Sequence, residues 1–209
     1  MMIRIEHREE KWEFPFVEYS CGITDKKLPL IIQLHGAGDR GNGKDIEKVD
    51  VNGFSKYLME AEHECIAIMP QCSEDTFWVA KIETLVRFIE KLIKEYNVDE
   101  NKVYLTGFSM GGYGTWFTAM ARPDLFAAIA PVCGGGMPWN ASVLKMPVWA
   151  FHGAKDTVVD VSNSEEMIKN LKETNEDVKY TRLEDVGHGA WKAAYTKELL
   201  EWLLSKTRK

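Results

Sequence analysis

The sequence lacks any long uninterrupted run of apolar residues. No segment approaches the length of a membrane-spanning helix, and residues 1–11 are charged where a secretory signal peptide would need an apolar core. A basic run is also missing, and the formal net charge of -6 argues against binding to nucleic acid or to an anionic membrane. We therefore expect a cytoplasmic protein without a nucleic-acid or membrane partner.

Cysteine is scarce, and its spacing does not match the usual metal motifs. The four cysteines form no C-x-x-C pair and lie within or beside apolar segments, which favours buried reduced thiols over disulfides or a metal site. The sequence also lacks internal repeats, low-complexity tracts and linkers. Its 209 residues, 45% hydrophobic and 28% charged, predict one domain covering residues 1–209. The sequence leaves the oligomeric state open, with a homodimer as one alternative.

Short apolar segments alternate with amphipathic segments along the chain. One or two antiparallel edge strands are expected within residues 3–19, where Pro15 limits pairing. Further strands are predicted at residues 28–34, 64–71, 103–105, 126–132, 148–151 and 178–183. Helices are predicted at residues 84–96, 113–121, 162–174 (with Ser162 and Glu165 as a capping box) and 193–204. This alternation predicts an α/β fold with a mostly parallel central sheet and helices on both faces.

The most informative stretch is residues 102–122, which contains G-F-S-M-G around Ser109. A strand before it, a turn predicted at residues 106–112 and a helix after it form the context in which G-x-S-x-G becomes a nucleophile elbow. Glycines at positions 107 and 111 allow the strand and the helix to approach closely. The serine hydroxyl is then exposed, and the backbone N–H of Met110 is available to an oxyanion. An ordinary Gly-Ser-Gly turn is the alternative.

A serine hydroxyl is a weak nucleophile unless a base accepts its proton, and a carboxylate must orient that base. Ligands of parallel sheets bind beyond the carboxyl ends of the strands, where Ser109, Asp156 and His188 follow in this order. Asp160 and Asp185 are weaker candidates for the acid. Asp160 precedes a predicted helix and can interact with its dipole, whereas Asp185 is too near the histidine in sequence to be needed.

The other histidines are weaker candidates for the base than His188, which lies between two glycines near the C-terminus. His7 and His63 lie in charged stretches and are expected on the surface. His35 and His152 each precede a glycine at a strand end, where a histidine usually forms hydrogen bonds with loop backbone.

With these motifs, the chain resembles the α/β-hydrolases, and in particular the small lidless carboxylesterases related to phospholipase/carboxylesterase and predicted-peptidase proteins. The motifs that carry the resemblance are L-H-G-A-G-D-R-G at residues 34–41, P-Q-C at 70–72, G-F-S-M-G-G at 107–112, H-G-A-K-D at 152–156 and G-H at 187–188. The resemblance implies Ser109 as nucleophile, His188 as base and Asp156 as orienting acid. It also implies an oxyanion hole formed by the backbone N–H groups of Met110 and Ala37.

Two departures narrow the resemblance. Acyl-protein thioesterases of the same broad group usually carry Gln after the serine, where this chain has Met110, and dienelactone hydrolases use a cysteine where it has Ser109. Only residues 133–146 separate two predicted strands between which lipases insert a cap. We therefore expect no cap domain and no tunnel for long triglycerides.

Three tryptophans are expected to border the site, namely Trp78, Trp139 and Trp191, although packing is an equal alternative for Trp139 and Trp191. We expect a serine carboxylesterase that hydrolyses small or polymer-borne esters through an acyl-enzyme, without metal or cofactor. An acyltransferase, a thioesterase or a peptidase on the same residues is the alternative within enzymes. A non-catalytic binding protein with this fold is the alternative outside them.

Overall fold

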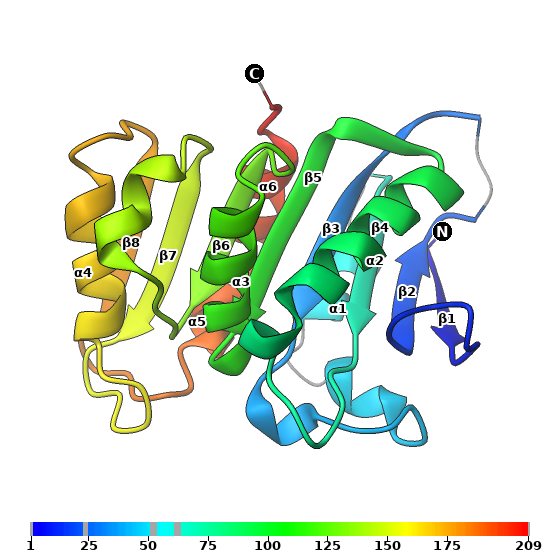
Figure 1. Ribbon diagram of the computed structural model, residues 1–209, viewed down its shortest axis with the longest axis horizontal. Coiled ribbons are helices and arrows are strands. Elements are labelled where there is room, and N and C mark those ends of the chain that lie inside the picture. The colour runs from blue at the N-terminus through cyan, green and yellow to red at the C-terminus, as the bar shows by residue number, and fades with distance from the viewer. Residues whose placement is uncertain (1, 23–24, 51–53, 61–63, 209) are drawn as a thin grey trace.

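The computed structural model describes residues 2–22, 25–50, 54–60 and 64–208, and it is built around one eight-stranded sheet (Figure 1). The strands are β1 (Ile3–His7), β2 (Phe16–Ser20), β3 (Leu28–Leu34), β4 (Ile66–Pro70), β5 (Val98–Phe108), β6 (Ala128–Val132), β7 (Val148–Gly153) and β8 (Val178–Leu183). Their order across the sheet is β1-β2-β4-β3-β5-β6-β7-β8. β1 pairs antiparallel with β2, and β2 pairs antiparallel with β4. The strands β3 to β8 are all parallel to one another. The predicted fold class is confirmed.

Helices cover both faces of the sheet. The α-helices are α1 (Phe54–Glu60), α2 (Ile82–Glu95), α3 (Met110–Ala121), α4 (Ser162–Leu171), α5 (Trp191–Ala194) and α6 (Lys197–Leu204). Short 3-10 helices are η1 (Ala37–Asp39), η2 (Ile46–Asp50), η3 (Trp78–Lys81) and η4 (Pro138–Val143). α2, α3 and α4 lie in front of the sheet in Figure 1, and α1, α5 and α6 lie behind it.

The parallel strands are apolar throughout because each of their faces contacts a separate core. Side chains two residues apart on a strand point to the same face. Leu30, Ile32 and Leu34 of β3 therefore join the core under α2, α3 and α4, whereas Ile31 joins the core under α1, α5 and α6. This two-sided burial explains why the strands read as continuous hydrophobic runs rather than as alternating ones.

Several predicted boundaries are wrong at the ends of helices. α3 begins at Met110, so the turn predicted at residues 106–112 is reduced to one residue between β5 and α3. The capping box is wrong because Ser162 is already helical, and its N–H donates to Asp160 Oδ1. The helix predicted at residues 193–204 is two helices, because Thr196 caps a new start by accepting a hydrogen bond from the Leu199 N–H.

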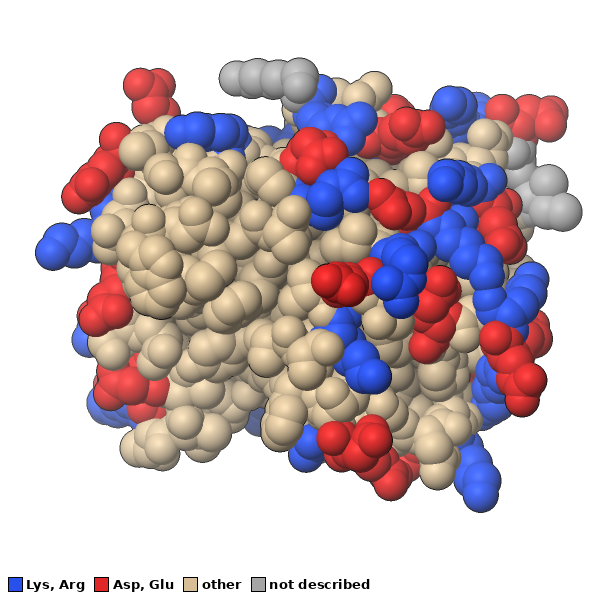
Figure 2. Space-filling model, in the orientation of Figure 1, with Lys and Arg blue, Asp and Glu red and all other residues tan. Residues whose placement is uncertain are grey.

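The connection between β6 and β7, residues 133–147, contains the single 3-10 helix η4 in place of a cap domain. Figure 2 shows that charged side chains gather over α2 and the neighbouring edge strands, whereas the surface over α3 and η4 is largely uncharged. No helix within the described ranges is long and apolar enough to cross a bilayer. All four cysteines are free thiols, as expected, and three of them are buried.

Candidate active site

Ser109 is the single residue that links β5 to α3, and its backbone is held in a rare conformation. Its φ and ψ angles are 56° and -115°, whereas few residues other than glycine adopt a positive φ. The turn is tight because two glycines allow close backbone contacts. A Cβ at Gly107 would lie 2.3 Å from Gly111 O, and a Cβ at Gly111 would lie 2.1 Å from Leu34 O. The strain at the serine is therefore imposed by packing on both sides of the elbow.

The Ser109 hydroxyl is the first member of a chain of hydrogen bonds. His188 Nε2 lies 2.8 Å from Ser109 Oγ, and His188 Nδ1 lies 2.7 Å from Asp156 Oδ2. Asp156 follows β7 and His188 follows β8, so the three side chains come from the carboxyl ends of different strands. In this geometry His188 Nδ1–H donates to the carboxylate, which leaves Nε2 free to accept the serine proton.

The Asp156 carboxylate is fully buried and remains ionised. Burial alone would raise its pKa, but hydrogen bonds from His188 and from the backbone N–H groups of Val159 and Val158 hold the pKa below its ordinary value. Both backbone groups donate to Asp156 Oδ1 at 2.9 Å, which leaves Oδ2 for the histidine. The carboxylate is therefore fixed in orientation before any substrate binds.

The two amides expected at the oxyanion each begin a helix. Met110 is the first residue of α3 and Ala37 is the first residue of η1, so neither N–H has an acceptor within its own helix. The loop that carries Ala37 packs against the elbow, because a Cβ at Gly36 would lie 3.3 Å from the ring of Phe108. The Met110 N–H thus adjoins Ser109 directly, and the loop that carries the Ala37 N–H contacts the residue before the serine.

Buried side chains fix the loop that carries Ala37. His35 is fully buried, with Nδ1 2.6 Å from Gly36 O and Nε2 2.9 Å from the Cys72 N. Burial lowers the pKa of His35 to about 4, so the ring is neutral and accepts the Cys72 N–H. Gln71 Oε1 accepts from the Gly43 N–H, and Gln71 Nε2 donates to Asp39 O.

Gln71 is a structural residue that sequence reasoning does not identify, because its contacts join segments that are 28 to 32 residues apart.

The structure corrects the expectation for Trp78. It is fully buried, contacts the rings of Phe14 and His35, and donates its Nε1–H to His35 O, so it supports the loop and cannot contact substrate. Trp191 lies 6.5 Å from Phe108, whose ring lies 4.9 Å from the ring of His188. Phe108 is therefore an aromatic neighbour of the base that sequence reasoning did not identify.

Trp139 lies on η4, which packs against α4 and α3, and it is 80% exposed. Its role in substrate binding stays a prediction, as does that of Trp191.

The competing candidates have other partners. His7 is half-buried rather than on the surface, with Nε2 2.7 Å from Glu18, and His63 lies outside the described residues. Asp160 Oδ1 accepts the Ser162 N–H, as expected of a residue at the start of a helix. Asp185 is exposed and pairs with Lys155. His152 contacts Ser164 and the backbone rather than the serine elbow.

Cys133 lies beside the acid and the base, and ligand atoms of Cys133, Asp156 and His188 lie within 4.8 Å of one another. Burial raises the pKa of the Cys133 thiol to about 12, so it stays protonated, and metals bind the thiolate. The carboxylate is already occupied by N–H donors. We therefore assign no metal ligands to this group.

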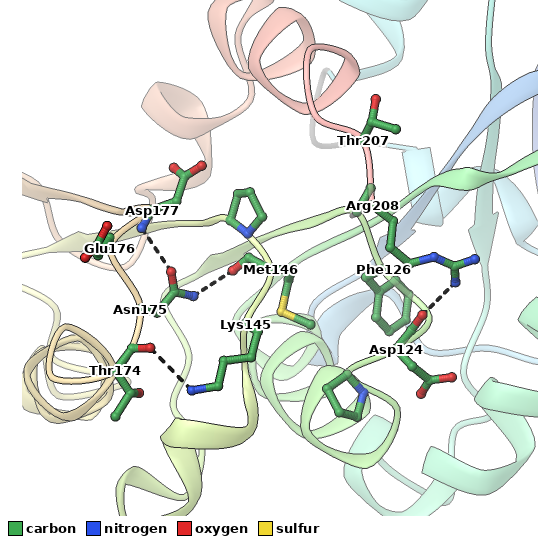
Figure 3. A pocket seen from close by; sticks show the side chains of 13 residues that line it. Asp124, Phe126, Lys145, Met146, Thr174, Asn175, Glu176, Asp177, Thr207 and Arg208 are labelled. Carbon is green, nitrogen blue, oxygen red and sulfur yellow. Dashed lines mark hydrogen bonds between the residues drawn. The ribbon is translucent and has the colours of Figure 1, made fainter.

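A separate hollow of about 880 Å³ lies at the opposite edge of the sheet, near the amino ends of β6, β7 and β8 (Figure 3). Two cationic side chains of this hollow donate hydrogen bonds to backbone carbonyls: Lys145 Nζ donates to Thr174 O, and Arg208 Nη1 donates to Asp124 O. This hollow therefore has no part in the arrangement around Ser109.

Comparison with known proteins identifies relatives of the chain. The family profile described as phospholipase/carboxylesterase matches residues 55–197. A bifunctional acetylxylan esterase/xylanase from Neocallimastix patriciarum is 32% identical over 152 residues, which are 69% of this chain and 22% of that protein. Feruloyl esterase B from Piromyces equi is 26% identical over 161 residues, which are 68% of this chain and 29% of that protein.

Solved structures agree with this result. A thermostable esterase superposes with a TM-score of 0.84 at 32% identity, over 99% of this chain and 63% of that one. An acylaminoacyl peptidase from Pyrococcus horikoshii superposes with a TM-score of 0.73 at 17% identity, which shows the common fold alone. The chain spans less than a third of the length of either curated relative.

Proposed function

The chain belongs to the phospholipase/carboxylesterase family of α/β-hydrolases, and from this premise we propose that it is a serine carboxylesterase. The observation that carries the proposal is the hydrogen-bonded chain from Ser109 Oγ through His188 to Asp156, which begins at a strained elbow. We further propose that residues 1–209 form a single α/β-hydrolase domain.

In the proposed reaction, Ser109 Oγ attacks the ester carbonyl carbon while His188 Nε2 takes the serine proton. The carbonyl oxygen becomes an oxyanion, and the N–H groups of Met110 and Ala37 stabilise it. His188 then gives its proton to the departing alcohol, which leaves an acyl group on the serine. Water attacks this acyl-enzyme with His188 again as base, and the acid and free Ser109 are released. Asp156 keeps the imidazole oriented and stabilises its positive charge in both steps.

We propose small or accessible esters as the substrates, including esters carried on a polymer. The connection between β6 and β7 contains only the short 3-10 helix η4 and no cap, which suits a substrate that approaches the site from solvent. The names of two relatives, an acetylxylan esterase/xylanase and a feruloyl esterase, support acetyl or feruloyl esters, including acetyl groups carried on xylan.

The proposal is tested by hydrolysis of p-nitrophenyl acetate by the wild type and by Ser109→Ala. Wild-type turnover with a burst of p-nitrophenol, lost in the variant, is expected, because the acyl-enzyme forms on the serine. Ser205→Ala, which also removes one hydroxyl but from an exposed serine after α6, is the matched control. If the protein folds but no ester, thioester or amide of a broad panel is hydrolysed, it is a binding protein. Faster acyl transfer to alcohols or amines than to water would identify an acyltransferase.

A further inference from the structure

Behind the acid lies a second histidine that the proposed reaction does not use. His152 is the fifth residue of β7 and is fully buried, four residues before Asp156. Its Nε2 lies 3.0 Å from Val159 O and 3.4 Å from Asp156 Oδ2. Its Nδ1 lies 2.7 Å from Ser164 Oγ, and this hydroxyl lies 2.8 Å from Gly134 O. The hydrogen bonds around Asp156 therefore continue away from Ser109 into the protein.

The number of hydrogen atoms available to this series of hydrogen bonds decides the protonation state of the His152 ring. Three short contacts must each hold one hydrogen: Gly134 O to Ser164 Oγ, Ser164 Oγ to His152 Nδ1, and His152 Nε2 to Val159 O. Both carbonyl oxygens are acceptors only, and the serine hydroxyl supplies one hydrogen. The two remaining hydrogens must come from the imidazole. A neutral imidazole carries only one, whereas an imidazolium carries two.

Each neutral form of the ring leaves a buried contact without a hydrogen. With the proton on Nδ1, the lone pair of Nε2 would face both Val159 O and the Asp156 carboxylate. With the proton on Nε2, Ser164 would donate to Nδ1 and leave its contact with Gly134 O unfilled. Rotating the ring by half a turn would place carbon atoms against both partners. Unpaired buried polar contacts are costly, so the doubly protonated ring fits the geometry best.

The charges around the ring favour this form. Asp156 provides a buried carboxylate whose Oδ2 lies 3.4 Å from His152 Nε2. The pKa of Asp160 is lowered mainly by hydrogen bonds from Ser162 and to a smaller extent by His152, so Asp160 is a second anion near the ring. The other titratable groups nearby are His188, which contacts the same carboxylate oxygen, and the protonated thiol of Cys133. Arg182, the neighbour of His152 on β8, is paired with Glu165 and Glu184. A buried cation needs a paired anion and filled hydrogen bonds, and His152 has both.

We propose that His152 is a positioning residue, a buried imidazolium that helps to fix Asp156 Oδ2, the oxygen that His188 also contacts. The proposal rests on the proposed function, because it explains how the orienting acid of that reaction is held. Two cations then share one carboxylate oxygen whenever His188 is protonated. The charge of His152 therefore opposes protonation of His188 and keeps the base in its neutral, active form to lower pH.

The state of the ring is tested directly by NMR of the full chain labelled with ¹⁵N in histidine. At about pH 7, above the ordinary histidine pKa of about 6.5, we expect one ring with two bonded, slowly exchanging N–H protons. These signals should vanish in His152→Gln, and Ser164→Ala should convert the ring to a neutral form. Lys169→Gln, a change at an exposed position of the same helix, is the control and should leave the signals unchanged. A neutral His152 ring in the wild type would overturn the proposal, whether or not the protein is an esterase.

Kinetics provide the second test. His152→Gln keeps an N–H donor but loses the charge, so the acid limb of the kcat/KM profile should move up by about one pH unit. We expect Ser164→Ala to move it in the same direction. A lower kcat with an unmoved acid limb in both variants would indicate a purely structural role and contradict the proposal. If the wild type shows no hydrolysis, the proposed function fails, while the NMR result still decides the state of His152.

Discussion

Lowering the pH from about 7 to about 5 should destabilise the protein through the imidazole of His35. This ring lies in the interior, where burial lowers its pKa to about 4 from an ordinary value of 6.5. The unfolded chain therefore binds a proton below about pH 6.5, whereas the folded protein resists protonation until about pH 4. In this window the unfolded state holds more protons, so the free energy of unfolding falls as the pH falls.

The two pKa values set the size of the effect. At pH 7 the protonation of His35 in the unfolded chain has little effect on the free energy of unfolding. By about pH 5 it lowers this free energy by roughly 2 kcal/mol. The loss reaches about 3 kcal/mol near pH 4, where the folded protein also begins to bind the proton. A change of this size is a large part of the stability of an ordinary domain.

Urea unfolding of the wild type and of His35→Gln at about pH 7 and about pH 5 measures this loss. The glutamine retains an acceptor for the Cys72 N–H but cannot be protonated. Carboxylates and the other histidines titrate in both proteins, so they cancel when the two pH differences are subtracted. We expect the wild type to lose roughly 2 kcal/mol more than the variant between the two pH values. Equal losses in the two proteins would refute the assignment of His35 as a buried neutral ring.

Three further predictions concern the loop, the elbow and the acid. Gln71→Ala removes the hydrogen bonds to the Gly43 N–H and Asp39 O, so we expect urea unfolding to show a free energy of unfolding lower by about 2 kcal/mol. We also expect a lower kcat in esterase assays, and an unchanged kcat would contradict the role of Gln71 in holding the loop. Gly111→Ala places a Cβ 2.1 Å from Leu34 O and should cost more than about 3 kcal/mol, whereas a fully stable variant would show that the elbow can relax. Asp156→Asn should retain the fold by circular dichroism and lower kcat by about four orders of magnitude, and a loss below tenfold would exclude it as the orienting acid.

The sheet was predictable because burial on both faces is visible in the sequence. The continuous apolar segment at residues 28–34 predicts β3 with its observed ends, since this strand contacts two cores. β5 (Val98–Phe108) extends well beyond the predicted residues 103–105. The elbow itself was predicted too long. Glycine spacing indicates a turn, but it does not show that Ser109 alone makes the connection in a conformation imposed by contacts with β3.

The remaining differences arise from contacts between segments that are distant in sequence. A tryptophan after a strand is consistent both with a binding surface and with packing, and only the contacts of Trp78 with His35 decide for packing. Gln71 forms hydrogen bonds with a loop about 30 residues earlier in the sequence. Ser164 of α4 forms a hydrogen bond with His152 of β7. The signal at Thr196 was local and readable, because a threonine three residues before the Leu199 N–H it binds is a typical N-cap.

Covalent labelling with a fluorophosphonate, located by peptide mass spectrometry, tests the central claim most directly. The reagent reacts with a serine only where a base and oxyanion donors activate it, so we expect one label, on Ser109, and much slower labelling in His188→Gln. A label at another residue, or the same labelling rate in His188→Gln as in the wild type, would contradict the account.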